Sequence, residues 1–228
     1  MFNPNPCDTE AALLARCRAI EGYSLGHLAQ HLQLCIPENA LQRKGWVGTA
    51  LEKVLGTTAG NQALPDFVEL GIELKTLPIN AEGKPAESTF VTSIPLLTIR
   101  NQTWETSQCW AKLRRVLWIP IEADPALAFA YRRIGKALLW TPSLAEQAVL
   151  AHDWIDLADM ISQGRLHELN AHRGEYLQVR PKAADARSLC YGLDEFGQKV
   201  LTMPRGFYLR SSFTASSILV ANDKYILS

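Results

Sequence analysis

Apolar residues recur every three or four positions in several stretches of the chain, which is the spacing of an amphipathic helix. In residues 9–21 this pattern ends at Gly22, and in the next stretch Ser24 can cap a helix that stops before Pro37. Three further helices are predicted, over 45–55 closed by Gly56, over 104–115 with Thr103 as the cap, and over 143–164 opened by Ser143.

The last of these helices has apolar residues that we expect to serve packing, namely Leu144, Val149, Ile155, Leu157 and Ile161. Strands are predicted where apolar residues alternate or run together, over 89–99, 116–123, 131–140, 175–181 and 204–213. The order of helices, strands, one long helix and more strands indicates a mixed α/β fold in two lobes.

One segment combines this alternation with charged residues. Residues 65–75, PDFVELGIELK, are predicted to form two short strands that turn at Gly71, with Asp66 on the first strand. Glu73 and Lys75 are two residues apart on the second strand, so both side chains leave the same face. Two carboxylates and one ammonium would then converge at a sheet edge.

That trio suits a divalent metal and a water molecule that attacks a phosphate. Asp66 and Glu73, with the backbone carbonyl of Leu74 and waters, are candidate ligands of Mg²⁺. Lys75 would orient or deprotonate the attacking water. Glu52, on the predicted helix just upstream, is a candidate ligand of a second ion.

The two apolar residues of the second strand, Ile72 and Leu74, are expected to face a core. A simpler alternative is a solvated hairpin with a surface Glu–Lys pair. The PD…ExK pattern alone does not separate the two interpretations, because short motifs often match by chance.

Composition narrows the class of protein. The chain has 228 residues and an apolar fraction of 47%, which supports one large domain or one domain split into two lobes. It has no run of about eighteen apolar residues, and its first residues lack the pattern of a secretory signal, so we expect no membrane span. The five cysteines show no CxxC spacing, which argues against a disulfide framework or a zinc site and favours the reduced cytoplasm.

The formal net charge is zero, which counts against a strongly basic, sequence-blind DNA-binding protein. The charges are unevenly distributed, however. Residues 164–210 contain eight Lys or Arg against five Asp or Glu, while the preceding helix carries Glu146, Asp153, Asp156 and Asp159. A neutral chain can therefore still present one basic face.

Six segments between residues 22 and 215 carry a resemblance to a known family: GYSLGHLA, PENALQRKGWVG, DFVELGIELKT, TWETSQCWAKLRRVLWIP, GEYLQVRPKAADA and LTMPRGFYLRSSFTA. They resemble the MutH family of mismatch-repair endonucleases, in the restriction-endonuclease-like superfamily with PD-(D/E)xK sites. The resemblance implies one endonuclease domain over 1–228, with a mixed sheet flanked by helices. It also implies two lobes, or arms, with a DNA-binding cleft and a hinge near residues 100–115.

The resemblance assigns roles to single residues. Asp66, Glu73 and Lys75 would be the catalytic trio, with Glu52 as an additional acid and Lys112 as a supporting lysine near the scissile phosphate. Without the resemblance, Lys112 would be interpreted as a surface helix lysine.

The resemblance also implies DNA binding by six residues, which are Lys44, Phe90, Arg180, Pro181, Lys182 and Tyr208. Basic side chains of the recognition segment can donate hydrogen bonds to guanine or simply hold phosphate. The two aromatic residues would lie near the adenine that can carry the methyl group. The alternatives are an exposed loop lysine, a strand end with basic side chains and core aromatic residues.

The implied activity is to nick the unmethylated strand of a hemimethylated GATC site with one or two Mg²⁺ ions. The implied partners are double-stranded DNA and MutL, an ATP-dependent activator that acts after MutS has detected a mismatch. We expect a cytoplasmic monomer. The alternatives are a stand-alone GATC restriction endonuclease, a module that binds hemimethylated DNA without cutting it, and a structural domain without salt-sensitive DNA affinity.

Overall fold

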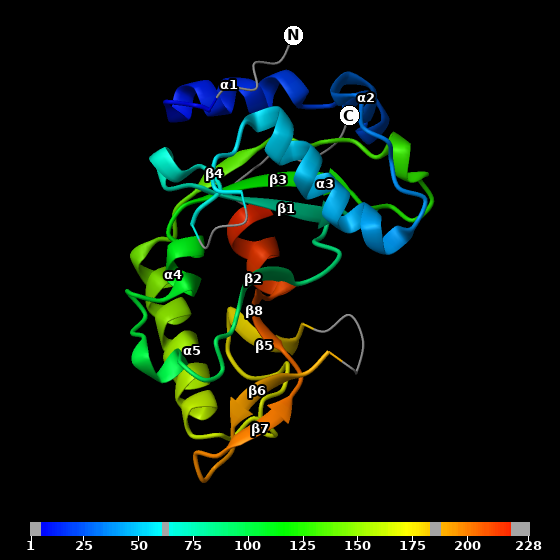
Figure 1. Cartoon of the computed structure of the whole chain (residues 1–228). Coiled ribbons are helices and arrows are strands. Elements are labelled where there is room, and N and C mark those ends of the chain that lie inside the picture. The colour runs from blue at the N-terminus through cyan, green and yellow to red at the C-terminus, as the bar shows by residue number, and fades with distance from the viewer. Residues whose placement is uncertain (1–5, 61–63, 183–187, 220–228) are drawn as a thin grey trace. The chain divides into compact units, whose positions relative to one another are not determined.

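The computed structural model describes residues 6–60, 64–182 and 188–219, and these form two compact units (Figure 1). Unit 1 comprises the described residues of Met1–Glu87, Arg115–Thr141 and Ala215–Ser228. Unit 2 comprises those of Ser88–Arg114 and Pro142–Thr214. The predicted hinge near 100–115 stays a prediction.

Unit 1 is built on a three-stranded sheet of order β1-β3-β4. Strands β1 and β3 are parallel, with Glu73 opposite Val116, and β3 and β4 are antiparallel. The elements are α1 (Glu10–Ile20), α2 (Leu25–Leu32), α3 (Ala40–Leu55), β1 (Glu73–Ile79), β3 (Val116–Glu122) and β4 (Leu138–Trp140), with 3₁₀ turns at Val68–Leu70 and Phe129–Tyr131.

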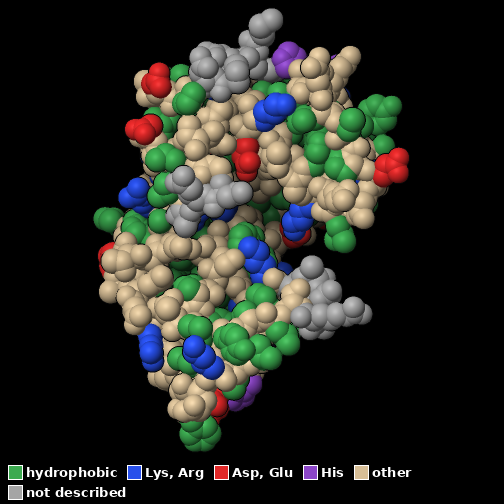
Figure 2. All heavy atoms as spheres, in the orientation of Figure 1, with side chains coloured by type: hydrophobic (Ala, Val, Ile, Leu, Met, Phe, Trp, Pro, Cys, Tyr) green, Lys and Arg blue, Asp and Glu red, His purple; other side chains and the backbone are tan. Residues whose placement is uncertain are grey.

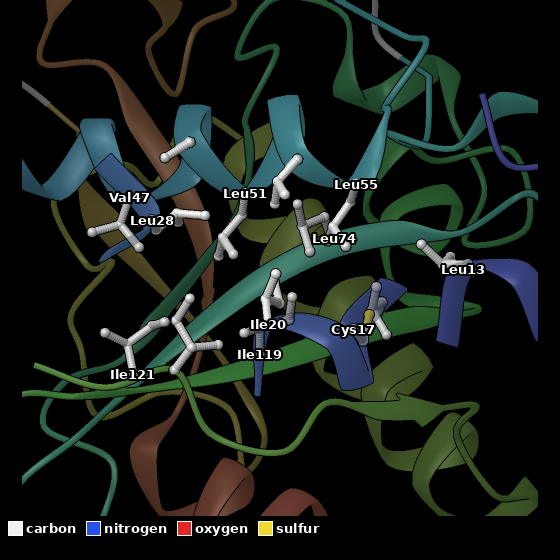
Figure 3. Packing of buried hydrophobic residues seen from close by; sticks show 14 of the residues in the cluster. Leu13, Cys17, Ile20, Leu28, Val47, Leu51, Leu55, Leu74, Ile119 and Ile121 are labelled. Carbon is white, nitrogen blue, oxygen red and sulfur yellow. The ribbon is translucent and has the colours of Figure 1, made fainter. Parts of the chain in front are cut away.

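Three helices and one face of the sheet share the hydrophobic core of unit 1. Ile72 and Leu74 belong to this core, which confirms that they face away from the side chains of Glu73 and Lys75. Figure 3 shows core side chains that come from α1 (Leu13, Cys17, Ile20), α2 (Leu28), α3 (Val47, Leu51, Leu55), β1 (Leu74) and β3 (Ile119, Ile121).

Unit 2 has a three-stranded antiparallel sheet of order β2-β8-β5 and a two-stranded ribbon, β6-β7. Helix α4 packs on β2, and the long helix α5 packs on β5. The elements are β2 (Thr89–Ser93), α4 (Gln108–Leu113), α5 (Leu144–Ser162), β5 (Leu177–Pro181), β6 (Cys190–Leu193), β7 (Lys199–Thr202), β8 (Arg205–Leu209) and α6 (Ser211–Phe213), with a 3₁₀ turn at Ile99–Asn101; a π-helical turn, Thr214–Leu219, follows.

The helix ends agree well with the local sequence signals. Ser24 caps α2 by accepting the His27 N–H, and Ser143 forms a capping box with Glu146 at the start of α5. Gly56 ends α3 with φ of 78°, a left-handed conformation that glycine adopts without strain. These caps use contacts over three or four residues, so the sequence alone predicts them.

Several element boundaries were predicted wrongly. The helix expected over 104–115 is only α4, and its cap is Ser107 rather than Thr103. The strand expected over 131–140 is reduced to β4, because the chain forms a 3₁₀ turn before it. The strand expected over 89–99 ends at Ser93.

The burial pattern of α5 also differs from the expectation. Leu144 is 87% exposed and Ile155 is 54% exposed, so these two residues do not pack as predicted. The charged residue Asp153 is instead 4% exposed. Its carboxylate accepts three backbone hydrogen bonds, which satisfies it inside the protein.

All five cysteines are free thiols. Burial raises the pKa of Cys17 to about 12, so this thiol stays protonated at neutral pH. None of the helices that the structure describes combines the length and apolar character needed to cross a lipid bilayer.

Candidate active site

The two acids and the lysine of the 65–75 segment meet at the start of β1. The Leu74 N–H donates to Asp66 Oδ2 over 2.7 Å, and Lys75 Nζ donates to Glu73 Oε1 over 3.2 Å. The Asp66 carboxylate therefore binds the peptide group that joins Glu73 to Leu74. The structure brings the predicted catalytic trio together.

A tight turn before β1 explains this arrangement. Gly71 ends the turn with φ of 64°. Phe67 and Ile72 then exchange two backbone hydrogen bonds, with N–O distances of 2.9 and 3.3 Å. Asp66, one residue before this pair, comes to lie beside Glu73, one residue after it. The prediction that Asp66 lies on a strand was wrong. Among the residues described, the segment before β1 forms only one isolated β-bridge, between Phe67 and Ile72.

The charged pair of β1 is almost fully buried. Glu73 is 5% exposed and Lys75 is 8% exposed, which excludes the alternative of a solvated surface pair. The register with β3 puts Val116 beside Glu73 and Trp118 beside Lys75. In such surroundings charges are weakly screened, so the ion pair helps to offset the cost of burying both groups.

Glu52 lies near the end of α3, and its side chain is exposed. Its backbone carbonyl accepts the N–H groups of Gly56 and Thr57, over 2.9 and 3.1 Å. The next residue, Thr58, donates its N–H to the backbone carbonyl of Asp66 over 2.9 Å. These backbone hydrogen bonds connect the end of α3, which carries Glu52, to the segment that carries Asp66.

The donor set at β1 fits a divalent metal. Asp66 and Glu73 supply two carboxylates at one peptide group of the strand, and Mg²⁺-type ions are often held by one or two carboxylates, waters and substrate phosphate. Across the described residues, no three His, Cys, Asp or Glu form a group that could hold a metal ion. The roles of Glu52 and of the Leu74 carbonyl as further ligands stay predictions.

Two other predicted lysines are in different settings. Lys44 lies on α3, its side chain is 73% exposed, and its Nζ pairs with Glu87 at 2.7 Å. Lys112 lies on α4 of unit 2 and is half-buried. Its role near the scissile phosphate stays a prediction.

Four predicted DNA-binding residues form one cluster in unit 2, which we call the reading face: Phe90, Arg180, Lys182 and Tyr208. Phe90 of β2 lies opposite Tyr208 of β8, with ring centroids 5.3 Å apart and an edge-to-face angle of 66°. The Lys182 ammonium is 3.9 Å from the centroid of Phe90, and the Arg180 guanidinium is 5.9 Å from that of Tyr208. The two aromatic residues are thus partly exposed, and each makes a cation–π contact, so neither is a core residue.

The rest of the predicted recognition segment is described only in part. Pro181, the last residue of β5, is exposed between Arg180 and Lys182 and lies opposite Arg205. Residues 183–186 of the segment lie outside the described residues. Burial lowers the pKa of Lys182, although its side chain remains accessible.

Sequence reasoning missed the short side chains that hold this cluster. Ser88 accepts a hydrogen bond from Arg180 over 2.6 Å, and Ser93 accepts one from Lys182 over 3.0 Å. Each serine is about ninety residues away from its partner in the sequence, so no local pattern could have revealed the pairing.

On the face shown in Figure 2, Lys and Arg side chains lie in several places, between uncharged side chains and a few acidic ones. The formal net charge of the chain is zero, so a general basic surface is not expected.

The mixed α/β fold, with two carboxylates and a lysine in the PD…ExK pattern at the start of a sheet strand, matches the restriction-endonuclease-like class of nucleases. Comparisons with known proteins specify the family. The family model described as "DNA mismatch repair enzyme MutH" matches residues 55–153. Proteins named DNA mismatch repair protein MutH from Shigella boydii serotype 18 and Escherichia coli K12 are 47% and 46% identical to the chain over 212 residues, which is 93% of this chain and 93% of each relative.

The chain belongs to the MutH family of DNA mismatch repair enzymes. The resemblance stated from the sequence and the mixed α/β fold class are confirmed, and the protein is an endonuclease that acts on DNA.

Proposed function

We propose that the protein nicks the unmethylated strand of hemimethylated GATC sites in a Mg²⁺-dependent reaction of methyl-directed mismatch repair. The observation that carries this proposal is the pair of carboxylates at one peptide group of β1, beside a buried lysine, in a chain of the MutH family. Two hard oxygen donors match the number of protein ligands that Mg²⁺ commonly takes.

When bound, a divalent ion polarises the phosphate and lowers the pKa of a bound water. The residues of this chain do the rest. Asp66, held by the Leu74 N–H, and Glu73, fixed in β1, keep two oxygens in a constant position. Lys75, held near Glu73, orients the attacking water and stabilises the negative charge that develops on the phosphate.

The reading face would supply specificity. Arg180 and Lys182 carry N–H donors that suit the O6 and N7 acceptors of guanine in the major groove. Phe90 and Tyr208 offer an aromatic surface to the adenine, and one extra methyl group there changes the fit modestly, by about 1–3 kcal/mol. When DNA binds, the exposed Lys44 releases Glu87 and contacts a backbone phosphate. Breaking the ion pair costs little, because a surface ion pair contributes little stability.

The partners in this proposal are MutL, which activates the nuclease, and MutS, which acts earlier by detecting the mismatch. The reaction takes place on chromosomal DNA in the cytoplasm. One catalytic trio per chain suits the cutting of a single strand, so the product is a nick.

Cleavage of a supercoiled plasmid tests the proposal. Its GATC sites are prepared unmethylated, hemimethylated or fully methylated, and each form is incubated with Mg²⁺, with and without MutL. We expect slow nicking that spares fully methylated DNA, is accelerated by MutL, and stops when EDTA removes the metal.

Other outcomes would contradict the proposal in distinct ways. Fast linearisation without MutL would indicate a stand-alone restriction endonuclease. Binding to hemimethylated sites without cleavage under any condition would indicate a DNA-binding module.

A further inference from the structure

The reading face is held in place by three small residues that carry no recognition chemistry of their own. We infer that Ser88, Ser93 and Gly206 are positioning residues that set the geometry of the reading face and thereby its discrimination between DNA sites. This inference rests on the proposed function, since it concerns how that same recognition is achieved.

The two serines hold the two cations from opposite ends of β2. Ser88 precedes the strand and accepts from Arg180 Nη1, while Ser93 ends the strand and accepts from Lys182 Nζ. A long basic side chain has many rotamers, and each hydrogen bond to a hydroxyl removes part of that freedom. The donors of both side chains are therefore partly oriented before any base arrives.

The backbone of the recognition segment is fixed by the neighbouring strand. Arg180 lies opposite Gly206 in the β5–β8 ladder, and the Lys182 N–H donates to the carbonyl of Pro204 over 2.7 Å. The cations are thus attached to a sheet edge rather than to a free loop, and the serines control only where their tips point.

Gly206 leaves the space in which the aromatic pair lies. A Cβ atom at this position would meet Phe90 Cε2 at 2.8 Å and Tyr208 Cε2 at 3.2 Å, and it would also meet the backbone oxygen of Thr92 at 3.2 Å. The first distance is closer than real Cβ contacts, so any larger residue here must move a ring.

The backbone itself does not require glycine here. Gly206 is not among the glycines with positive φ, and it lies inside strand β8. Glycine weakens the interior of a strand, and it often marks a site where other groups approach closely. The requirement at this position is therefore room for the rings of Phe90 and Tyr208.

Displacing these rings should change specificity more than chemistry. A single methyl group in an apolar contact is discriminated by about 10–200-fold, so a small shift of the aromatic surface is enough to lose much of that ratio. The same shift affects Lys182, because its ammonium lies 3.9 Å from the centroid of Phe90. The cleavage rates at the correct site and at wrong sites should then become more similar.

Gly206→Ala is the direct test, and Gly192→Ala is its matched control. In the control, a Cβ would meet Leu166 Cδ1 at 2.9 Å and Thr202 Cγ2 at 3.1 Å, so the two substitutions add one methyl group at similar crowding within unit 2. Cleavage rates are measured on duplexes with an unmethylated, hemimethylated or fully methylated GATC site and on a site with one changed base. Melting temperatures report whether both variants fold.

We expect Gly206→Ala to lower the preference for the correct site by about 5–50-fold, while Gly192→Ala keeps the wild-type ratios. Unchanged ratios in folded Gly206→Ala would overturn the role of Gly206. A wild-type enzyme that shows no GATC preference would instead contradict the proposed function, so the two failures are distinguishable.

Replacing either serine by alanine removes the hydroxyl and adds no atoms. Ser88→Ala and Ser93→Ala should each reduce discrimination against the changed base, about 3–10-fold, and Ser93→Thr, which restores a hydroxyl, should recover it. If Gly206→Ala does not fold, wild-type specificity in both alanine variants would overturn the inference.

Discussion

The two groups of candidate functional charges, one in each unit, are stabilised in opposite ways. In unit 1, Glu73 and Lys75 are almost fully buried on a strand whose other face packs in a hydrophobic core. In unit 2, Arg180 and Lys182 are exposed at the end of a strand and rest on aromatic rings. The first arrangement holds charges rigidly and weakly screened, while the second keeps donors accessible to a ligand.

In the proposed function, this difference corresponds to two tasks. Phosphodiester hydrolysis needs oxygens and an ammonium whose positions do not change when the substrate binds. Reading a base sequence needs donors that are open to solvent until the DNA arrives, yet confined to few orientations. Variants of each unit should therefore fail differently, with loss of rate in unit 1 and loss of binding or selectivity in unit 2.

The largest effect is expected for Glu73→Ala. Cleavage should fall by about 10³-fold or more, because the charge stabilisation lost with a metal ligand amounts to several kcal/mol. DNA binding should be retained or improved, since a negative charge is removed. Single-turnover cleavage and equilibrium binding measure the two separately.

Glu69→Ala is the matched control for this variant, because Glu69 is an exposed acid in the turn just before β1. It should leave both quantities near their wild-type values. An equal loss of binding and cleavage in Glu73→Ala would show that the residue acts structurally.

The next largest effect concerns stability. Asp153→Ala removes a buried carboxylate that accepts the N–H groups of Glu175, Tyr176 and Leu177 at 2.7–2.9 Å. These hydrogen bonds fix the start of β5, which carries the recognition segment. Leaving the three N–H groups without an acceptor should lower the free energy of unfolding by about 2–4 kcal/mol. Chemical denaturation checks this value.

The exposed Asp156, on the same helix, provides the control. Asp156→Ala should change the free energy of unfolding by less than about 0.5 kcal/mol. Similar losses in the two variants would mean that the three backbone contacts of Asp153 contribute no special stability.

A smaller effect is expected for Lys182→Ala. DNA affinity should fall by about 10-fold, since one base or phosphate contact contributes roughly 1–3 kcal/mol. A uniform loss on all sequences would identify a phosphate contact, whereas a loss confined to GATC would identify base reading. Lys199→Ala, on the exposed edge of β7, is the control and should leave GATC affinity unchanged.

The smallest effect concerns the pH dependence of unit 2. Two hydrogen bonds from Arg165 lower the pKa of Glu168 from 4.5 to about 2. The folded state binds this proton less readily than the unfolded state, so the contact stabilises unit 2 above about pH 4.5 and is lost as the pH falls towards 2.

Glu168→Gln should therefore lower the melting temperature slightly at pH 6 and have a smaller effect at pH 3. Glu175→Gln, an exposed acid in the same unit, serves as the control. A decrease for Glu168→Gln that is equal at both pH values would contradict the assignment to this carboxylate.

The sequence by itself determined the features that depend on neighbours along the chain. It predicted the caps Ser24 and Ser143 and the end of α3 at Gly56, because these signals act within one helical turn. It also predicted the alternation around Glu73, because successive strand residues point to opposite faces. Asp66, Glu73 and Lys75 lie within ten positions of one another, and so the sequence could also predict that they meet.

Tertiary structure decided the features that depend on segments returning from far along the chain. It buried Glu73 and Lys75 by pairing β1 with β3, and it turned Asp153 inwards while leaving Leu144 and Ile155 exposed. Helical spacing alone does not fix which face of α5 is buried, and the segments that pack on it, β5 and the Ile99–Asn101 turn, make the choice.

The reading face shows the same limit most clearly. Its residues come from β2, β8, β5 and the residue that follows β5, and the serine contacts join positions 92 and 89 residues apart. No property of Ser88, Ser93 or Gly206 distinguishes it in the sequence, because its role is defined by the distance to a side chain on another strand. The local sequence thus determined where the charged residues lie and where helices begin and end. Long-range packing decided which of these residues contact one another.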